Sequence, residues 1–155
     1  MDILAHFALG LYLSFKFESY WPLFFSCIFD IDHIIGYFYD KRKKTLVEIP
    51  SFLHIAYRPR SWFHSFWGFL IVLVPFIFFL PLEIVAVPLI LHLFLDLLDK
   101  NGIFTFPPIV RKKIKGHLPV GYLVEDPAYL KTHKRSHIPS LLASVIFFLL
   151  MILRV

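Results

Sequence analysis

The sequence predicts an all-α fold, a polytopic bundle of about five membrane-spanning helices in a single domain, with a basic loop region on the cytoplasmic side. Hydrophobic residues make up 58% of the 155 residues, against roughly 45–50% in a typical soluble domain. Aromatic residues make up 19%, charged residues only 17%, and the mean hydropathy is +0.70. This composition argues against an ordinary soluble globular domain.

Five apolar runs are the candidates for these helices: residues 3–17, 20–39, 62–81, 83–99 and 137–153. A spanning helix needs about 20 residues, so the first and last runs are short for this role. Lys16, Glu18 and Pro22 separate the first run from the second. Pro81 and Glu83 indicate a tight hairpin between the third run and the fourth.

Two basic segments, residues 40–61 and 100–136, connect the helices and contain most of the 16 Lys and Arg residues. Positively charged loops of membrane proteins face the cytoplasm, so we expect both segments and the N-terminus there, in the inner cell membrane. The net charge of +5 suits anionic lipid headgroups. Nucleic acid is a poor explanation of this charge because no soluble recognition module accompanies it.

Carboxylates inside the apolar runs carry the functional signal. Four of them lie within these runs or at their edges: Asp30, Asp32, Asp96 and Asp99. One such charge costs about 2.5–3.5 kcal/mol at the centre of a spanning helix, so the set needs compensation. Neutral histidines cannot neutralise carboxylates, whereas one or two divalent cations can.

The spacing of these residues predicts that they converge. His92, Asp96 and Asp99 follow one another at i, i+4 and i+7, which places all three on one face of a helix. Asp30 and His33 are three residues apart and share a face of the second run in the same way. Asp32 lies about 100° round the second run from His33.

The depth of these residues points the same way. In the topology expected from Lys and Arg, His6 begins the first run and His64 begins the third, both on the cytoplasmic side where the carboxylates lie. Four separate segments thus place polar residues at one level. The predicted metal ligands are His6, Asp30, Asp32, His33, His64, His92 and Asp96.

The expected cofactor is one or two divalent metal ions. Cys27 is the only cysteine, so a multi-cysteine metal site cannot form. Mixed imidazole and carboxylate donors suit Zn, which is the first candidate, with Mn and Fe as alternatives. The expected inner ligands are Asp32, His33, His92 and Asp96. Further ligands, orienting groups or a general base are expected among His6, Asp30, His64 and Asp99.

Hydrolysis is the expected chemistry, because such a metal activates water and polarises a phosphoryl oxygen. The catalytic candidates are Asp30, His64 and Asp99, together with Arg60, whose guanidinium would bind phosphate. Basic residues flank the site at the expected headgroup level. We therefore expect a phospholipid or another phosphoester at the cytoplasmic leaflet as the substrate.

At these residues the chain resembles the LexA-regulated inner-membrane metal-dependent hydrolases, a family of small multi-span proteins. The matching positions are His6, Asp30-Ile31-Asp32-His33, Arg60 with His64-Ser65, and His92 with Asp96, Asp99 and Gly102. The resemblance implies a helical membrane fold, a bound metal and a hydrolase activity. The third motif departs from the family, with Pro59, Ser61 and Phe63 in place of its His, Gly and Thr.

Two other functions remain open from the sequence. A divalent-cation or proton transporter would use the same acids to line a path, although residues 66–82 and 138–153 contain no acid. In a noncatalytic membrane protein, the metal would only hold the helices together. Membrane lipid is the expected partner, nucleic acid is not, and association into a homo-oligomer is left open.

Overall fold

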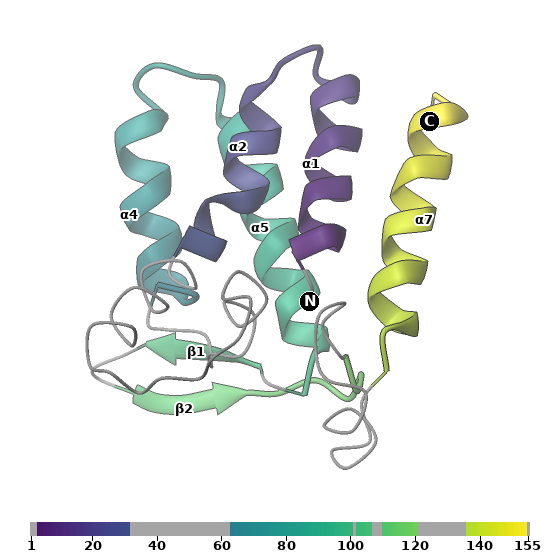
Figure 1. Ribbon diagram of the computed structural model, residues 1–155. Helices are drawn as coiled ribbons and strands as arrows, with labels where there is room; N and C mark the ends of the chain where they lie inside the picture. Colours follow the sequence, from purple (N-terminus) through teal and green to yellow (C-terminus); the bar gives the residue numbers. More distant parts are fainter. Residues whose placement is uncertain (1–2, 32–62, 101, 107–109, 121–135, 155) are drawn as a thin grey trace, which may run out of the picture.

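The computed structural model describes residues 3–31, 63–100, 102–106, 110–120 and 136–154. Within these ranges the chain is mostly helical, with one β-hairpin below the helices (Figure 1). The helices are α1 (Ile3–Lys16), α2 (Trp21–Cys27), the 3-10 helix η1 (Ile28–Asp30), α4 (Phe66–Phe76), α5 (Leu82–Leu98) and α7 (Ile138–Ile152). The strands are β1 (Ile103–Phe106) and β2 (Val110–Ile114).

The membrane bundle predicted from composition is wrong. In the described ranges, no helix combines the length and the apolar character needed to cross a membrane. The longest, α5, has 17 residues, whereas a span needs about 20. The apolar run at 20–39 changes from α-helix to 3-10 helix after Cys27, and the run at 62–81 is α-helical only from Phe66 to Phe76.

The predictions that depended on membrane-spanning helices are wrong as well. These are the description as a transmembrane protein, the location in the inner membrane and the cytoplasmic orientation of the N-terminus and site. Composition misled because it counts apolar residues without measuring the length of each helix. Some of the hydrophobic excess also lies on the surface: Phe78 is 76% exposed and Phe79 is 83% exposed.

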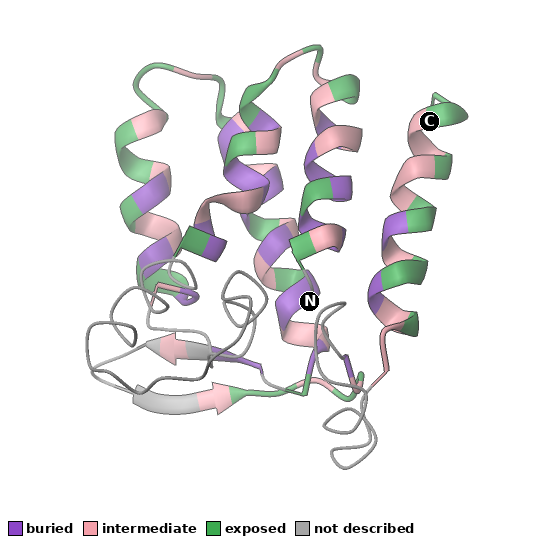
Figure 2. Cartoon of the chain, viewed as in Figure 1, coloured by how far each residue is buried: buried purple, intermediate pink, exposed green. Residues whose placement is uncertain are grey.

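Helix α5 lies at the centre of the bundle, where α2 and α4 pack against it, and α1 packs between α2 and α7 (Figure 1). Two apolar clusters hold these helices together. The first contains Ala5, Leu9, Leu13, Leu95 and Val120. The second contains Phe25, Phe29, Val72, Val85 and Leu89. Buried positions are frequent on α1, α2 and α5, whereas α7 is mainly half-buried or exposed (Figure 2).

The hairpin closes one end of the bundle, where α1 and α4 begin and α5 ends (Figure 1). Its strands pair in antiparallel fashion, with Ile103 opposite Ile114. Gly102 has a φ of +63°, a left-handed conformation that suits glycine, and its N–H bonds to the carbonyl of Asp99. The residues after α5 are thereby tied back to the helix end that carries the candidate site.

Candidate metal centre

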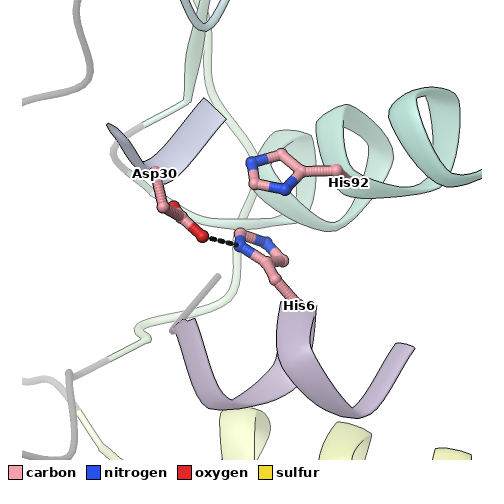
Figure 3. A group of neighbouring side chains, drawn as sticks. All are labelled: His6, Asp30 and His92. Carbon is pink, nitrogen blue, oxygen red and sulfur yellow. Dashed lines mark hydrogen bonds and ion pairs between the residues drawn. The ribbon is translucent and has the colours of Figure 1, made fainter. Parts of the chain in front are cut away.

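Five side chains from four segments meet at the hairpin end of the bundle. The five residues are His6 on α1, Asp30 on η1, His64 just before α4, and His92 and Asp96 on α5. Asp30 is 6% exposed, and the other four are fully buried. Figure 3 shows His6 and His92 with the Asp30 carboxylate beside them, each from a different element. We call these five residues the His/Asp cluster.

The imidazole nitrogens of the His/Asp cluster face carboxylate oxygens at short range. His6 Nδ1 lies 3.0 Å from Asp30 Oδ2, and His6 Nε2 lies 3.3 Å from Asp96 Oδ1. His64 Nε2 lies 3.5 Å from Asp96 Oδ2 and 3.8 Å from Asp30 Oδ1. His92 Nε2 lies 3.4 Å from Asp96 Oδ2. Each carboxylate therefore faces at least two histidines.

A backbone carbonyl on α2 fixes the orientation of His92. The ring Nδ1–H donates a hydrogen bond of 2.6 Å to the Ser26 carbonyl oxygen, which leaves Nε2 directed at Asp96. Burial lowers the pKa of His92 to about 4, and the neighbouring His6 adds to this effect. The ring is therefore neutral at pH 7, with a lone pair on Nε2, which is the form that coordinates a metal.

The other charges of the cluster depend on one another. Burial opposes protonation of His6, but the nearby Asp30 and Asp96 raise its pKa above the ordinary value. Burial would likewise raise the pKa of Asp30, but His6 and His92 hold it well below its ordinary value. Asp30 is therefore ionised at neutral pH. In the protein without metal, the raised pKa favours the protonated form of His6, and that extra proton has to leave before the ring binds a metal.

The geometry of the His/Asp cluster could hold a metal ion. Nε2 of His6 and of His92 are fully buried and make no hydrogen bond within the described residues, although each lies close to Asp96. In a tetrahedral zinc site with bonds of 2.0–2.1 Å, neighbouring ligand atoms lie about 3.3–3.4 Å apart. The 3.4 Å between His92 Nε2 and Asp96 Oδ2 matches that spacing, whereas the other imidazole–carboxylate separations range from 3.0 to 3.8 Å.

Two overlapping groups of three residues could hold a metal ion. One contains His6, Asp30 and His92, and the other contains His64, His92 and Asp96. The ligand atoms within each group lie within 4.8 Å of one another. Since His92 belongs to both groups, the five residues form one continuous site.

Packing keeps the histidines in place. The rings of His6 and His92 lie 3.7 Å apart between centroids, and the buried Phe29 ring contacts the edge of His92 at 5.1 Å. His64 lies in the turn that leads into α4, where a Cβ at Gly68 would overlap the Phe63 carbonyl oxygen. Gly68 thus lets this turn fold onto α4 and carry His64 into the cluster. An apolar wall such as Phe29 strengthens electrostatic interactions within the site.

The structure does not bring together every residue that the sequence singled out. Asp99 is fully buried but belongs to neither group of three, and its N–H contacts the Asp96 carbonyl oxygen at 3.3 Å. The predicted ligands Asp32 and His33, the predicted phosphate clamp Arg60 and the altered motif position Pro59 lie outside the described residues. Their part in the site stays a prediction.

Sequence reasoning missed two contributors, Ser26 and Phe29. Ser26 supplies the carbonyl that orients His92, and Phe29 supplies the ring that covers it. Ser26 stands four residues before Asp30, so helical spacing alone places both on one face of the second apolar run. The spacing could therefore have predicted that Ser26 lies near Asp30. It could not have predicted the bond to His92, because the backbone carbonyl makes that bond and every residue type has one.

No protein-family model, curated protein or solved structure matches this chain. Its function therefore has to be inferred from the geometry of the His/Asp cluster.

Proposed function

We propose that the protein is a metal-dependent hydrolase of the phosphoester class, with the His/Asp cluster as its metal centre. The observation that carries this proposal is the convergence of three imidazoles and two carboxylates from four segments, all nine-tenths or more buried. Side chains so distant in sequence share one buried site only when their mutual attraction, or a common ligand, offsets the cost of burial.

Charge balance supports a divalent cation. Asp30 and Asp96 place two carboxylates in a site where His92 is neutral. A proton on His6 compensates one of these charges, whereas a divalent cation compensates both and leaves His6 neutral as a ligand. The donor set of imidazole and carboxylate favours Zn, with Mn and Fe as alternatives. Two groups that share His92 are compatible with one ion or two.

Hydrolysis is the chemistry that such a centre supplies: a divalent metal lowers the pKa of water towards about 7 and polarises a phosphoryl oxygen. The protein contributes positioning. Ser26 holds His92 in one tautomer, and the ionised Asp30, which has the one slightly exposed side chain of the cluster, can accept a hydrogen bond from water and orient it. His6 links the two carboxylates on either side.

Positive charge near this end of the bundle favours an anionic substrate. Lys100 lies two residues beyond the end of α5 and is exposed, and its N–H bonds to the Leu118 carbonyl oxygen. Lys115 is exposed on the neighbouring segment after β2. The lipid part of the sequence prediction depended on a membrane face, so we limit the substrate to the phosphoester class.

Metal content and turnover test the proposal together. Protein purified without chelator is analysed by inductively coupled plasma mass spectrometry and assayed with bis(p-nitrophenyl) phosphate. We expect close to stoichiometric metal and nitrophenol release in the wild type, and loss of both in His92→Ala. His117→Ala, which removes an exposed histidine, is the matched control and should keep both. Equal turnover in the wild type and His92→Ala would refute the assignment.

A structural metal site is the second candidate, and near-complete burial of the His/Asp cluster favours it, because structural sites are closed whereas catalytic sites keep an open position. The same preparations separate the two functions. Stoichiometric metal, a large fall in thermal stability on chelation and no turnover of any phosphoester tested would establish the structural role. Turnover that His92→Ala abolishes would establish the enzyme.

A further inference from the structure

The end of α1 opposite the His/Asp cluster borders a cavity. A cavity of about 890 Å³ opens there between the end of α1, the start of α2 and the end of α7. Lys16, at this end, comes ten positions after His6, which is about 15 Å along a helix. The volume lies within the roughly 300–1,000 Å³ of small-molecule sites.

The charged side chains around the cavity give it a net positive rim. Lys16 and Arg154 contribute two cations, and Glu18 contributes one carboxylate. Lys16 Nζ makes a long contact of 3.5 Å with the Tyr12 hydroxyl, and within the described residues the side chains of Glu18 and Arg154 make no hydrogen bond or ion pair. Two of the three charges are therefore available to a ligand.

Two of the charged residues at this cavity have an unusual backbone conformation. Glu18 has a φ of +49° and Arg154 a φ of +54°, the two positive values at non-glycine residues in the described part of the chain. Each follows a helix end, α1 or α7, where glycine is the favoured residue. Both residues line the cavity, so the strained backbone positions and the charged rim coincide.

The wall behind this rim is apolar. Leu11 and Phe15 on α1, Leu23 on α2 and Met151 on α7 line it. We propose that the cavity binds an amphiphilic anion, a carboxylate or phosphate group attached to an alkyl chain. Arg154 and Lys16 hold the head group through charge-assisted hydrogen bonds, and the chain lies against the apolar wall. The site shares no residue with the His/Asp cluster, so it does not depend on the proposed hydrolase function.

Isothermal titration calorimetry of the full chain tests this site with four probes: decanoate, decyl phosphate, inorganic phosphate and the uncharged decyl glucoside. Hydrogen bonds to charged groups are the strong ones, so we expect both alkyl anions to bind at least about tenfold more tightly than the glucoside. They should also bind more tightly than inorganic phosphate. The tighter of the two anions identifies the head group.

Variants assign this binding to named residues. Arg154→Gln and Lys16→Gln should each weaken binding of the alkyl anions by about tenfold, whereas Arg154→Lys should keep most of it. His117→Gln, at an exposed position beside Leu118, whose N–H bonds to the Leu98 carbonyl oxygen at the end of α5, is the control and should bind like the wild type. Far-ultraviolet circular dichroism confirms folding of each variant.

Three outcomes would overturn the proposal. The first is equal binding of the glucoside and the alkyl anions, since the charged rim would then play no part. The second is binding of inorganic phosphate as tight as that of decyl phosphate, since the apolar wall would then play no part. The third is unchanged binding in folded Arg154→Gln and Lys16→Gln.

Discussion

The two ends of helix α1 place an ionisable side chain in opposite surroundings. Near its start, His6 is fully buried and lies within 3.3 Å of carboxylate oxygens from two other segments. At its end, Lys16 is exposed at the rim of an open cavity and makes one long contact with Tyr12. Burial therefore makes the charges of one end interdependent, whereas water keeps those of the other end nearly independent.

This contrast sets how each end should respond to substitution. In the His/Asp cluster, removal of one member leaves a buried charge or lone pair without compensation, so effects should be large and should spread to the neighbours. At the cavity, water reaches the charged side chains, so removal of one of them leaves no buried charge uncompensated. Effects there should be small on stability and confined to ligand binding.

The largest difference should separate two carboxylates on the same helix. Asp96→Asn removes a charged ligand that faces His6, His64 and His92, so bound metal should fall below detection and metal affinity by at least about 100-fold. Asp99→Asn changes an equally buried carboxylate that belongs to neither metal group and should retain the metal. Elemental analysis of both purified variants measures this. Loss of metal in both would extend the cluster to Asp99.

The pH dependence of stability should come next in size. In the metal-free protein, the pKa of His92 is lowered from 6.5 to about 4, so the unfolded chain binds more protons between these values. Stability due to His92 is present above pH 6.5 and is lost as the pH falls towards 4, by roughly 3 kcal/mol. The raised pKa of His6 acts in the opposite sense, because its stabilisation is present at low pH and is lost as the pH rises.

Comparison with His92→Gln isolates the contribution of His92. Urea unfolding in the presence of chelator at pH 4.5 and pH 7 gives the free energy of unfolding of both proteins. The advantage of the wild type over the variant should be roughly 2.5 kcal/mol larger at pH 7. The same difference at both pH values would mean that His92 titrates normally in the folded protein.

The sequence predicted much of the helical layout because the signals are local. The apolar run 83–99 corresponds to α5 at Leu82–Leu98, and the run 137–153 corresponds to α7 at Ile138–Ile152. It did not predict that the run at 20–39 leaves the α-helical path at Cys27, because its residues stay apolar across that change. The incorrect membrane assignment has the same origin.

For the candidate site, spacing and charge were informative to different degrees. Asp96 lies four residues after His92, which makes the two side chains neighbours on the helix, and His92 Nε2 lies 3.4 Å from Asp96 Oδ2. Asp99 has the same periodicity but lies outside the metal groups, because α5 ends at Leu98 and the Asp99 backbone is extended. The end of a predicted helix is uncertain by one or two residues. Asp99, one of the predicted site residues, falls within that uncertainty.

A smaller effect should come from the crossing of α1 and α2. A Cβ at Gly10 would lie 2.9 Å from the Leu23 Cα and 3.0 Å from the Ser26 Cβ, so Gly10→Ala should push α2 away. The Ser26 carbonyl would then move from His92 Nδ1, and metal affinity should fall by about tenfold. Competition with a fluorescent chelator measures this affinity.

Ser26→Ala is the control for this crossing, since it keeps the carbonyl and removes only the hydroxyl, which makes no hydrogen bond within the described residues. Its metal affinity should stay near that of the wild type. A loss in Ser26→Ala as large as in Gly10→Ala would show that the hydroxyl, and not the position of the carbonyl, supports His92.

The smallest effect, with the opposite sign, should come from the cavity end. Glu18 holds a left-handed φ of +49° where α1 ends, with the Ser19 N–H bonded to the Ser14 carbonyl oxygen at 3.0 Å. In the folded protein, that conformation costs a non-glycine residue about 1–2 kcal/mol, and glycine avoids this cost. Glycine is also more flexible in the unfolded chain, which cancels about 0.5–1 kcal/mol of the gain. Glu18→Gly should therefore raise the free energy of unfolding by about 0.5 kcal/mol in urea titrations. Glu83→Gly, in the first turn of α5, should lower it instead, and a loss in both variants would show that the Glu18 carboxylate stabilises the fold.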